Sequence, residues 1–144
     1  MKSVLIAKGV GILFLLSACA DQTLVPPLPE SAFTTIAKDA SGQLATLYPP
    51  AKTHLVLKAD AGTLFDNRFK SQLRHCGYAL DEIKEDAATV PKSGGKQLSY
   101  VLDALTNVAQ YGYYRLTLNI GDEQLSRLYD ANNLRKPNYW SYRK

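Results

Sequence analysis

The sequence has no apolar run long enough to span a membrane, and it has very little cysteine. A membrane-spanning helix needs about 20 apolar residues, and the stretch 9–18 supplies about half of that number. Lys8 interrupts the apolar run just upstream. The only two cysteines among the 144 residues are Cys19 and Cys76. These shortages disfavour a retained membrane helix and limit the chain to one internal disulfide at most.

The segment Leu16-Ser17-Ala18-Cys19 has the pattern of a bacterial lipobox. A basic start, an apolar core and small residues before a cleavage point are typical of a secretory signal peptide. In lipoprotein signals the peptidase cuts before the cysteine, whose sulfur carries a diacylglyceryl group. We therefore predict that residues 1–18 are a lipoprotein signal peptide. Cys19 is then the lipidated first residue of the mature chain, and its acyl chains hold the protein on a bilayer.

The residues that follow the lipobox favour one membrane over the other. An aspartate directly after the lipidated cysteine favours retention in the inner membrane of enterobacteria. Here that position is Ala20, and Asp21 comes one residue later. We therefore expect the protein to be lipid-anchored at the periplasmic face of the outer membrane.

The mature chain has room for one small domain. Residues 19–30 contain three prolines and no apolar period, which predicts an extended, lipidated tether. Residues 31–144 suffice for a single core. Without Lys2 and Lys8, 15 of the 17 basic side chains remain against 13 acidic ones, a formal charge of +2. Because the lipid occupies Cys19, no internal disulfide can form, and packing alone must hold the fold.

Hydrophobic periodicity predicts two helices in the first half of the domain. Apolar residues recur at helical spacing over residues 33–47, behind Ser31 as a candidate N-cap. A second helical face covers residues 65–76 and follows Thr63 in a capping-box pattern. Gly77 then ends this helix.

Alternating apolar residues predict a sheet that dominates the second half. We expect strands at residues 54–58, 78–83, 98–103, 113–120, 124–129 and 138–142. The partial alternation of the second strand suits a sheet edge, and the stretch 84–96 is predicted to be a mobile surface loop. The fold class is therefore α+β, a single small domain with one or two helices packed on a mainly antiparallel sheet.

No catalytic or metal-binding signature accompanies the two histidines. The sequence contains no His-Glu-x-x-His motif, no cysteine cluster for zinc and no Gly-x-Ser-x-Gly. The glycine-rich stretch 93–96 lacks two of the positions that define a phosphate loop. The acidic residues between 81 and 86 could hold a cation, but a solvated edge explains them as well. We therefore predict a non-enzymatic protein with no catalytic residue, metal ion or cofactor.

Aromatic side chains gather in the last third of the sequence. Tyrosine and tryptophan are favoured where an apolar body meets a polar partner, so the rings suit either the core or a protein interface. Our candidate interface residues are Tyr113, Tyr139, Trp140 and Tyr142. Basic residues at 135–136 and 143–144 lie among these rings, a mixture that also suits single-stranded nucleic acid. The weak net charge favours a solvated tail instead.

Four short segments of the mature chain carry a family pattern. They are Leu44–Thr53 with its Tyr-Pro-Pro-Ala motif, Tyr78-Ala79-Leu80, Tyr114-Arg115-Leu116-Thr117-Leu118, and the closing Tyr139-Trp140. Together they resemble the TrbH family of conjugal transfer lipoproteins, over most of the mature chain. The lipidated position carries over to Cys19, and no catalytic residue carries over.

The resemblance implies a non-enzymatic part of a mating-pair-formation apparatus, a type IV secretion machine that moves plasmid DNA between bacteria. It implies contacts with other core subunits of the channel and assembly as a ring or a hetero-oligomer under the outer membrane. Direct binding of nucleic acid is not expected. The alternative is a lipoprotein module whose tyrosine-rich face binds the cell wall or a glycan.

Overall fold

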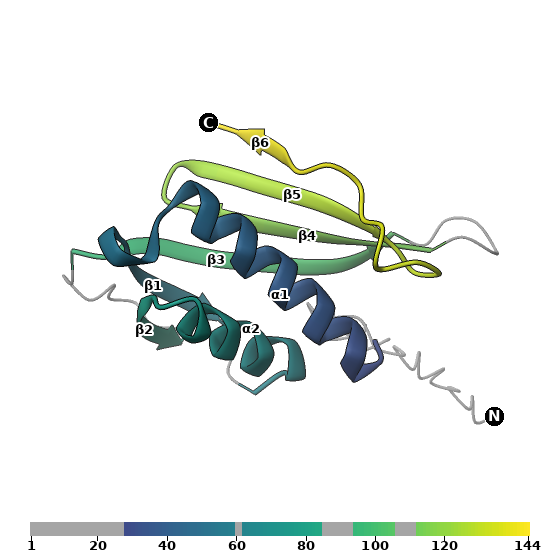
Figure 1. Ribbon diagram of the computed structural model, residues 1–144, viewed down its shortest axis with the longest axis horizontal. Coiled ribbons are helices and arrows are strands. Elements are labelled where there is room, and N and C mark those ends of the chain that lie inside the picture. Colours follow the sequence, from purple (N-terminus) through teal and green to yellow (C-terminus); the bar gives the residue numbers. More distant parts are fainter. Residues whose placement is uncertain (1–27, 60–61, 85–93, 106–111) are drawn as a thin grey trace, which may run out of the picture.

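The computed structural model describes residues 28–59, 62–84, 94–105 and 112–144. In chain order, the elements of these residues are α1 (Glu30–Leu47), the short 3-10 helix η1 (Pro50–Lys52), β1 (His54–Ala59), α2 (Leu64–His75), β2 (Ala79–Lys84), β3 (Lys96–Leu105), β4 (Tyr113–Ile120), β5 (Glu123–Asp130) and β6 (Ser141–Arg143). Both α-helices lie on one face of a single sheet (Figure 1). The predicted α+β class is confirmed.

The six strands form one sheet in the order β2-β1-β3-β4-β5-β6. β1 is parallel to both of its neighbours, whereas the pairs from β3 to β6 are antiparallel. The parallel pair β1–β2 is joined through α2, as a parallel connection requires. α2 lies beside β1 and β2, while α1 crosses β3, β4 and β5 diagonally (Figure 1). The predicted edge strand is indeed at the edge, as β2.

The core lies between the helices and the sheet. On β4, Leu116, Leu118 and Ile120 are fully buried, as the alternation of the sequence predicts for a strand with one covered face. On α1, Ile36 and Leu44 are also fully buried against this layer. Each such side chain contributes about 1.5–3 kcal/mol relative to an exposed one.

An aromatic cluster joins α1, α2 and β3. Phe65 stacks on Phe69 with ring centroids 5.6 Å apart. Tyr100 meets both rings edge-on, at 5.0 Å and 5.6 Å. Phe33 of α1 completes the cluster at 6.2 Å from Phe65. These geometries are the favoured ones for aromatic pairs, so the cluster fixes the two helices against the sheet.

Local signals set the ends of α2 but not the start of α1. The Thr63 hydroxyl accepts a hydrogen bond from the amide of Asp66, so the predicted cap is confirmed. Gly77 has φ +93° and lets the chain leave the helix, with the amide of Tyr78 donating back to the carbonyl of Leu73. The predicted cap at Ser31 is wrong, because the helix begins at Glu30 with Pro29 at the N-cap position, and no side chain caps it.

Candidate functional site at the aromatic sheet edge

Residues near the C-terminus form the outer strand on one side of the sheet and carry exposed aromatic rings. β6 pairs with β5 through Tyr142 and Leu125, and Leu125 is buried under α1. Because paired residues of an antiparallel ladder share a face, Tyr142 lies on the helix side of the sheet. Tyr139 is 97% exposed and Tyr142 is 54% exposed. Trp140 between them packs partly against the core. We call Tyr139, Trp140 and Tyr142 the aromatic edge.

The paired strand is shorter than the sequence predicts. A strand over residues 138–142 was expected, but only Ser141–Arg143 pairs with β5. The amide of Asn138 donates a hydrogen bond to the carbonyl of Leu128, which fixes the chain to β5 before the strand begins. The rings at 139 and 140 therefore lie in an irregular segment, where Trp140 packs partly against the core and Tyr139 is exposed.

A groove of about 280 Å³ opens between the end of α1 and the aromatic edge. Its lining residues are Gln43, Leu47, Tyr48, Glu123, Leu125, Trp140 and Tyr142. Leu47 is 42% exposed, so apolar surface reaches the solvent beside the rings. The groove has the size and lining to receive a side chain of a protein partner.

Hydrogen-bonding groups stand on the floor and rim of this groove. The Tyr48 hydroxyl donates a hydrogen bond to the carboxylate of Glu123. Desolvation and a hydrogen bond to Glu123 hold the pKa of Tyr142 above its ordinary value. The Lys96 ammonium lies 4.9 Å from the centre of the Tyr48 ring, in cation–π geometry. The groove thus combines apolar walls with a small number of fixed polar groups.

A polar network holds the aromatic edge in place. The Asp39 carboxylate on α1 accepts hydrogen bonds from Arg127 at 2.9 Å and from the Tyr129 hydroxyl at 2.7 Å. Burial and the hydrogen bond to Asp39 raise the pKa of Tyr129, which keeps its hydroxyl protonated as a donor. Arg127 also donates to the carbonyl of Asn138 at 2.6 Å. One charge pair therefore connects α1, β5 and the segment that carries the rings.

Trp140 is the anchor of the edge. The Arg127 guanidinium lies 5.3 Å from the centre of its ring. Its indole Nε1 is buried and has no hydrogen-bond partner among the described residues. Buried donors are normally paired, so this unpaired N–H lowers the stability of the edge.

The structure does not bring Tyr113 together with the other candidate interface residues. Tyr113 pairs with Asp130 at one end of β5, whereas Tyr142 pairs with Leu125. The five steps from Leu125 to Asp130 correspond to roughly 17 Å along the strand, and an odd number of steps places the side chains on opposite faces. Tyr113 is 38% exposed on the face without helices. The candidate interface thus divides into the aromatic edge and one distant tyrosine.

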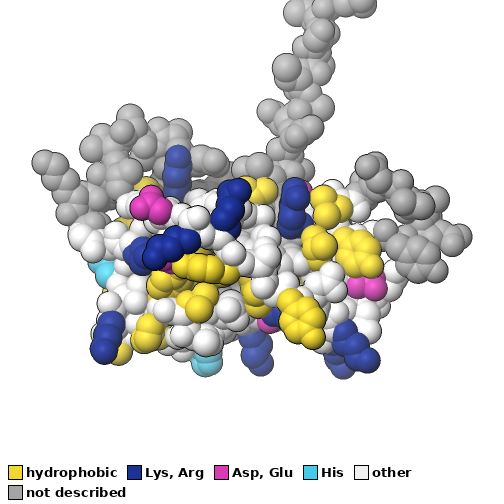
Figure 2. Space-filling model, turned by 90° about the horizontal axis from the view of Figure 1, so that it is seen from above, with side chains coloured by type: hydrophobic (Ala, Val, Ile, Leu, Met, Phe, Trp, Pro, Cys, Tyr) yellow, Lys and Arg dark blue, Asp and Glu magenta, His cyan; other side chains and the backbone are white. Residues whose placement is uncertain are grey.

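Basic side chains surround the aromatic edge. Residues 131–144 contain Arg135, Lys136, Arg143 and Lys144 and no acidic residue. All four are exposed. Figure 2 looks onto this side of the molecule and shows hydrophobic and basic side chains side by side, with few acidic ones. The sequence favoured a solvated tail here; the four basic side chains are exposed, and Ser141–Arg143 of this segment pairs with the sheet as β6.

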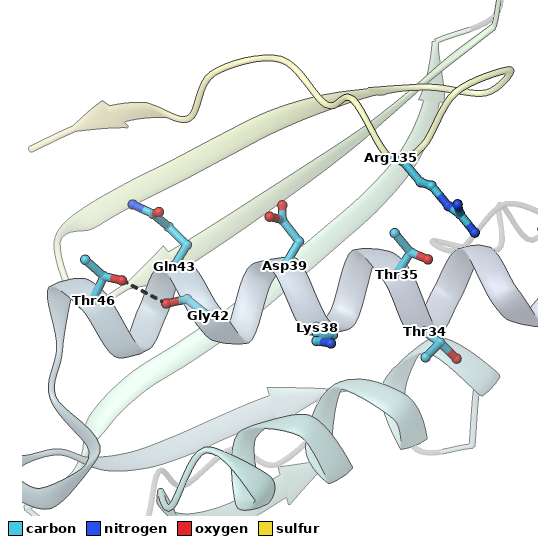
Figure 3. Close-up of a pocket in the computed structure, with 8 residues that line it drawn as sticks. All are labelled: Thr34, Thr35, Lys38, Asp39, Gly42, Gln43, Thr46 and Arg135. Carbon is cyan, nitrogen blue, oxygen red and sulfur yellow. Dashed lines mark hydrogen bonds between the residues drawn. The ribbon is translucent and has the colours of Figure 1, made fainter.

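A second, larger groove of about 630 Å³ runs along the outer side of α1. Figure 3 shows its lining residues, Thr34, Thr35, Lys38, Asp39, Gly42, Gln43, Thr46 and Arg135. Three of its threonine hydroxyls donate to helix carbonyls four residues earlier. The groove therefore offers methyl groups, hydroxyl lone pairs, two cations and the Asp39 carboxylate to a polar ligand.

The predicted lipidation site lies outside the part of the chain that the structure describes, whereas part of the acidic cluster lies within it. Cys19 lies outside the described residues. In the acidic cluster, Asp81 pairs with His54 at 3.1 Å, and Glu82 pairs with Lys70 and Arg74. The stretch 85–93, with the rest of the cluster and most of the predicted loop, also lies outside them. No group of three potential ligands in the described residues could hold a metal ion.

Sequence reasoning missed the residues that support the aromatic edge. Asp39 and Arg127 are 88 positions apart, and neither belongs to a motif. Asp39 follows Lys38 directly in the sequence, so its charge alone gave no sign of a long-range partner. Leu47 and Glu123 likewise line the groove only because the end of α1 and the start of β5 meet in the fold.

The protein is a small α+β domain with its helices on one face of the sheet. Its aromatic and basic edge is suited to contact with another protein. The family model for conjugal transfer protein TrbH matches residues 19–143. The chain belongs to the TrbH family and is thus a conjugal transfer component. This is not a known enzyme family, and its role in transfer suggests contacts with other subunits of the transfer system.

No curated protein and no solved structure matches the chain. Among the helices of the described residues, none is long and apolar enough to cross a membrane.

Proposed function

We propose that this protein is a non-enzymatic lipoprotein of the outer-membrane part of a conjugative type IV secretion channel, where it assembles with other core subunits. The observation that carries the proposal is the family match over residues 19–143. The aromatic edge supports a contact role, because exposed tyrosine and tryptophan beside basic side chains are enriched where proteins bind each other.

The anchoring step of the proposal depends on Cys19. Lipidation there attaches the domain to the periplasmic face of the outer membrane, and the stretch up to α1 acts as the tether. Two or more acyl chains hold a protein stably on a bilayer, whereas one chain holds it reversibly. We expect Cys19→Ser to accumulate as an unlipidated precursor. Mass spectrometry of the membrane fraction measures this, and normal lipidation and fractionation of that variant would contradict the proposal.

Deletion of the gene tests the role in the channel. We expect the deletion to abolish plasmid transfer while DNA processing in the donor stays normal. Complementation with the wild-type gene should restore transfer, and purification of the tagged protein in mild detergent should bring other channel subunits with it. Normal mating frequency in the deletion strain would contradict the proposed function.

The groove along α1 supports a second candidate, a module that binds a cell-wall glycan. Threonine hydroxyls, Lys38 and Arg135 line this groove and suit a hydroxyl-rich ligand with acidic groups. Pull-down with purified peptidoglycan separates the two candidates. Strong retention that Lys38→Ala weakens would favour the glycan, and absence of retention would leave the channel role.

A further inference from the structure

The sheet ends in two unlike strands that both have a free side. In the order β2-β1-β3-β4-β5-β6, the outermost strands are β2 and β6, and each pairs on one side only within the described residues. An outer strand presents unpaired amide and carbonyl groups that can pair with another chain. The two edges lie at opposite sides of the molecule (Figure 1).

The directions of these two strands are compatible with a continuous sheet. β2, β1, β3 and β5 run in one direction, and β4 and β6 run in the opposite direction. A second copy placed beside the first in the same orientation would set its β2 antiparallel to β6. Its helices would cover the same face of the sheet. Antiparallel pairing is slightly more stable per residue than parallel pairing.

Charges on the face without helices are complementary at the two edges. Arg143 lies on this face, since it pairs with Gln124, one step from the buried Leu125. It has no ion-pair partner among the described residues, and Lys144 follows it. On β2, Asp81 lies on the same face beside His54, with a side chain that is 50% exposed. Pairing of the edges would bring Arg143 to Asp81.

The helix face of the junction is complementary as well. Tyr142 stands on this face of β6, half-exposed. On β2 the same face carries Glu82, which is bound by Lys70 and Arg74 of α2. A tyrosine ring beside an arginine side chain is a favourable cation–π arrangement. Each face of the junction therefore joins groups that attract each other.

We propose that copies of this chain join head to tail, with β6 of one copy pairing antiparallel with β2 of the next. The inference rests on the proposed function for its setting in the channel, and it names one partner of the aromatic edge as a second copy. A head-to-tail interface uses two different surfaces, so it generates a closed ring when the rotation between copies closes.

The distance between the two edges allows a clean test. Five strand spacings of about 4.8 Å place β2 and β6 of one copy roughly 24 Å apart. A disulfide requires Cα atoms within about 7 Å, so a bond between these strands can form only between different copies.

The test mixes two forms of the full chain, each with its own tag, in which Cys76→Ser leaves one introduced cysteine beside the lipidated Cys19. One form contains Asp81→Cys and the other contains Arg143→Cys, at exposed sites that the core does not need. After mild oxidation in membranes, we expect a disulfide-linked dimer that carries both tags. Size measurement of the wild-type protein in mild detergent should show oligomers.

Matched controls define the contradictory results. Asp122→Cys replaces an exposed aspartate on the β4–β5 turn, and with Arg143→Cys it should give only the background of random collision. Dimers of Arg143→Cys alone would indicate a symmetric contact and would overturn the inference. A wild-type protein that is monomeric in detergent, with cross-linking no higher than in the Asp122→Cys control, would overturn the inference too. The short, charged edges would then be features that keep the protein monomeric. In both cases mating of the deletion strain still tests the proposed function separately.

Charge reversal adds an independent readout. Arg143→Asp should reduce the oligomer, and Asp81→Arg in the same chain should restore it, since the attraction is then re-established with exchanged signs. Failure of the double variant to recover, in chains that are folded by circular dichroism, would contradict the proposed pairing.

Discussion

The two ends of the sheet are held by different means. At the β2 end, groups close in sequence cooperate: Thr63 caps α2, and Lys70 bridges Asp66 at 2.5 Å and Glu82 at 2.8 Å. At the β6 end, the support comes from Asp39 and Arg127, which are 88 positions apart. The β2 end therefore depends on contacts that are local in sequence and on the common core. The second end is a surface positioned by one long-range charge pair.

Loss of an aromatic core residue should affect both ends equally. We expect Phe69→Ala to lower the free energy of unfolding by about 3–5 kcal/mol, because a fully buried ring leaves a cavity. Chemical denaturation followed by circular dichroism measures the change. If only the β2 end loosened in hydrogen exchange while β5 and β6 kept their protection, the two ends would not share one core.

Removal of the Asp39 carboxylate should affect the β6 end first. We expect Asp39→Ala to cost about 2 kcal/mol, because the largely buried Arg127 and the buried Tyr129 hydroxyl lose a charged acceptor. Hydrogen exchange should rise in residues 138–143 before it rises in α2. Exchange that rises uniformly would contradict the separate support of this edge. Glu30→Ala, which removes an exposed partner of Arg68, is the matched control and should have little effect.

Tyr78 connects the β2 end to the end of α1 and should make stability sensitive to alkali. Its hydroxyl donates to the carbonyl of Tyr48 at 2.6 Å, and burial raises the pKa of Tyr78 to about 12 from 10.0. The folded state keeps this proton while the unfolded state loses it. The resulting stability is complete below pH 10 and is lost as the pH rises from 10 towards 12.

Tyr78→Phe should therefore cost about 1 kcal/mol at neutral pH, the usual value of one hydrogen bond. Its unfolding free energy should fall less than that of the wild type between pH 10 and 12, as denaturation at several pH values would measure. Parallel pH profiles for the two proteins would show that this phenol does not titrate as described.

The smallest expected change is a gain in stability. Gly42 lies inside α1, and a Cβ there would meet nothing within 4 Å. Gly42→Ala should stabilise the domain by about 0.5–1 kcal/mol, because alanine loses less backbone entropy in a helix. Gly77→Ala is the opposite control, since φ +93° strains any side chain there. A thermal melt that shows both variants destabilised would contradict the open position of Gly42.

Much of the fold follows from side-chain period alone. The alternation over residues 113–120 predicts β4 and its buried face because only one face of the sheet is covered. Thr63 and Gly77 predict the ends of α2 because their effects are local. The parallel pairing of β1 with β2 and β3 did not follow, since strand order depends on how separate segments meet in space.

The candidate site was predictable only in part. The composition of residues 139–142 suits either the core or an interface, and the structure places Tyr139 and Tyr142 in the solvent. The separation of Tyr113 from this surface depends on strand register, and the link from Asp39 to Arg127 depends on how α1 crosses the sheet. Neither leaves a mark in the local sequence.

Mating frequency with an altered aromatic edge measures whether plasmid transfer needs this surface. A donor strain that carries Tyr139→Ser and Tyr142→Ser on a stable, lipidated chain should transfer its plasmid far less often than the wild type. Tyr113→Ser, an exposed tyrosine on the opposite face, should transfer normally. Equal transfer by all three strains would contradict the role of the aromatic edge as the contact surface of the protein.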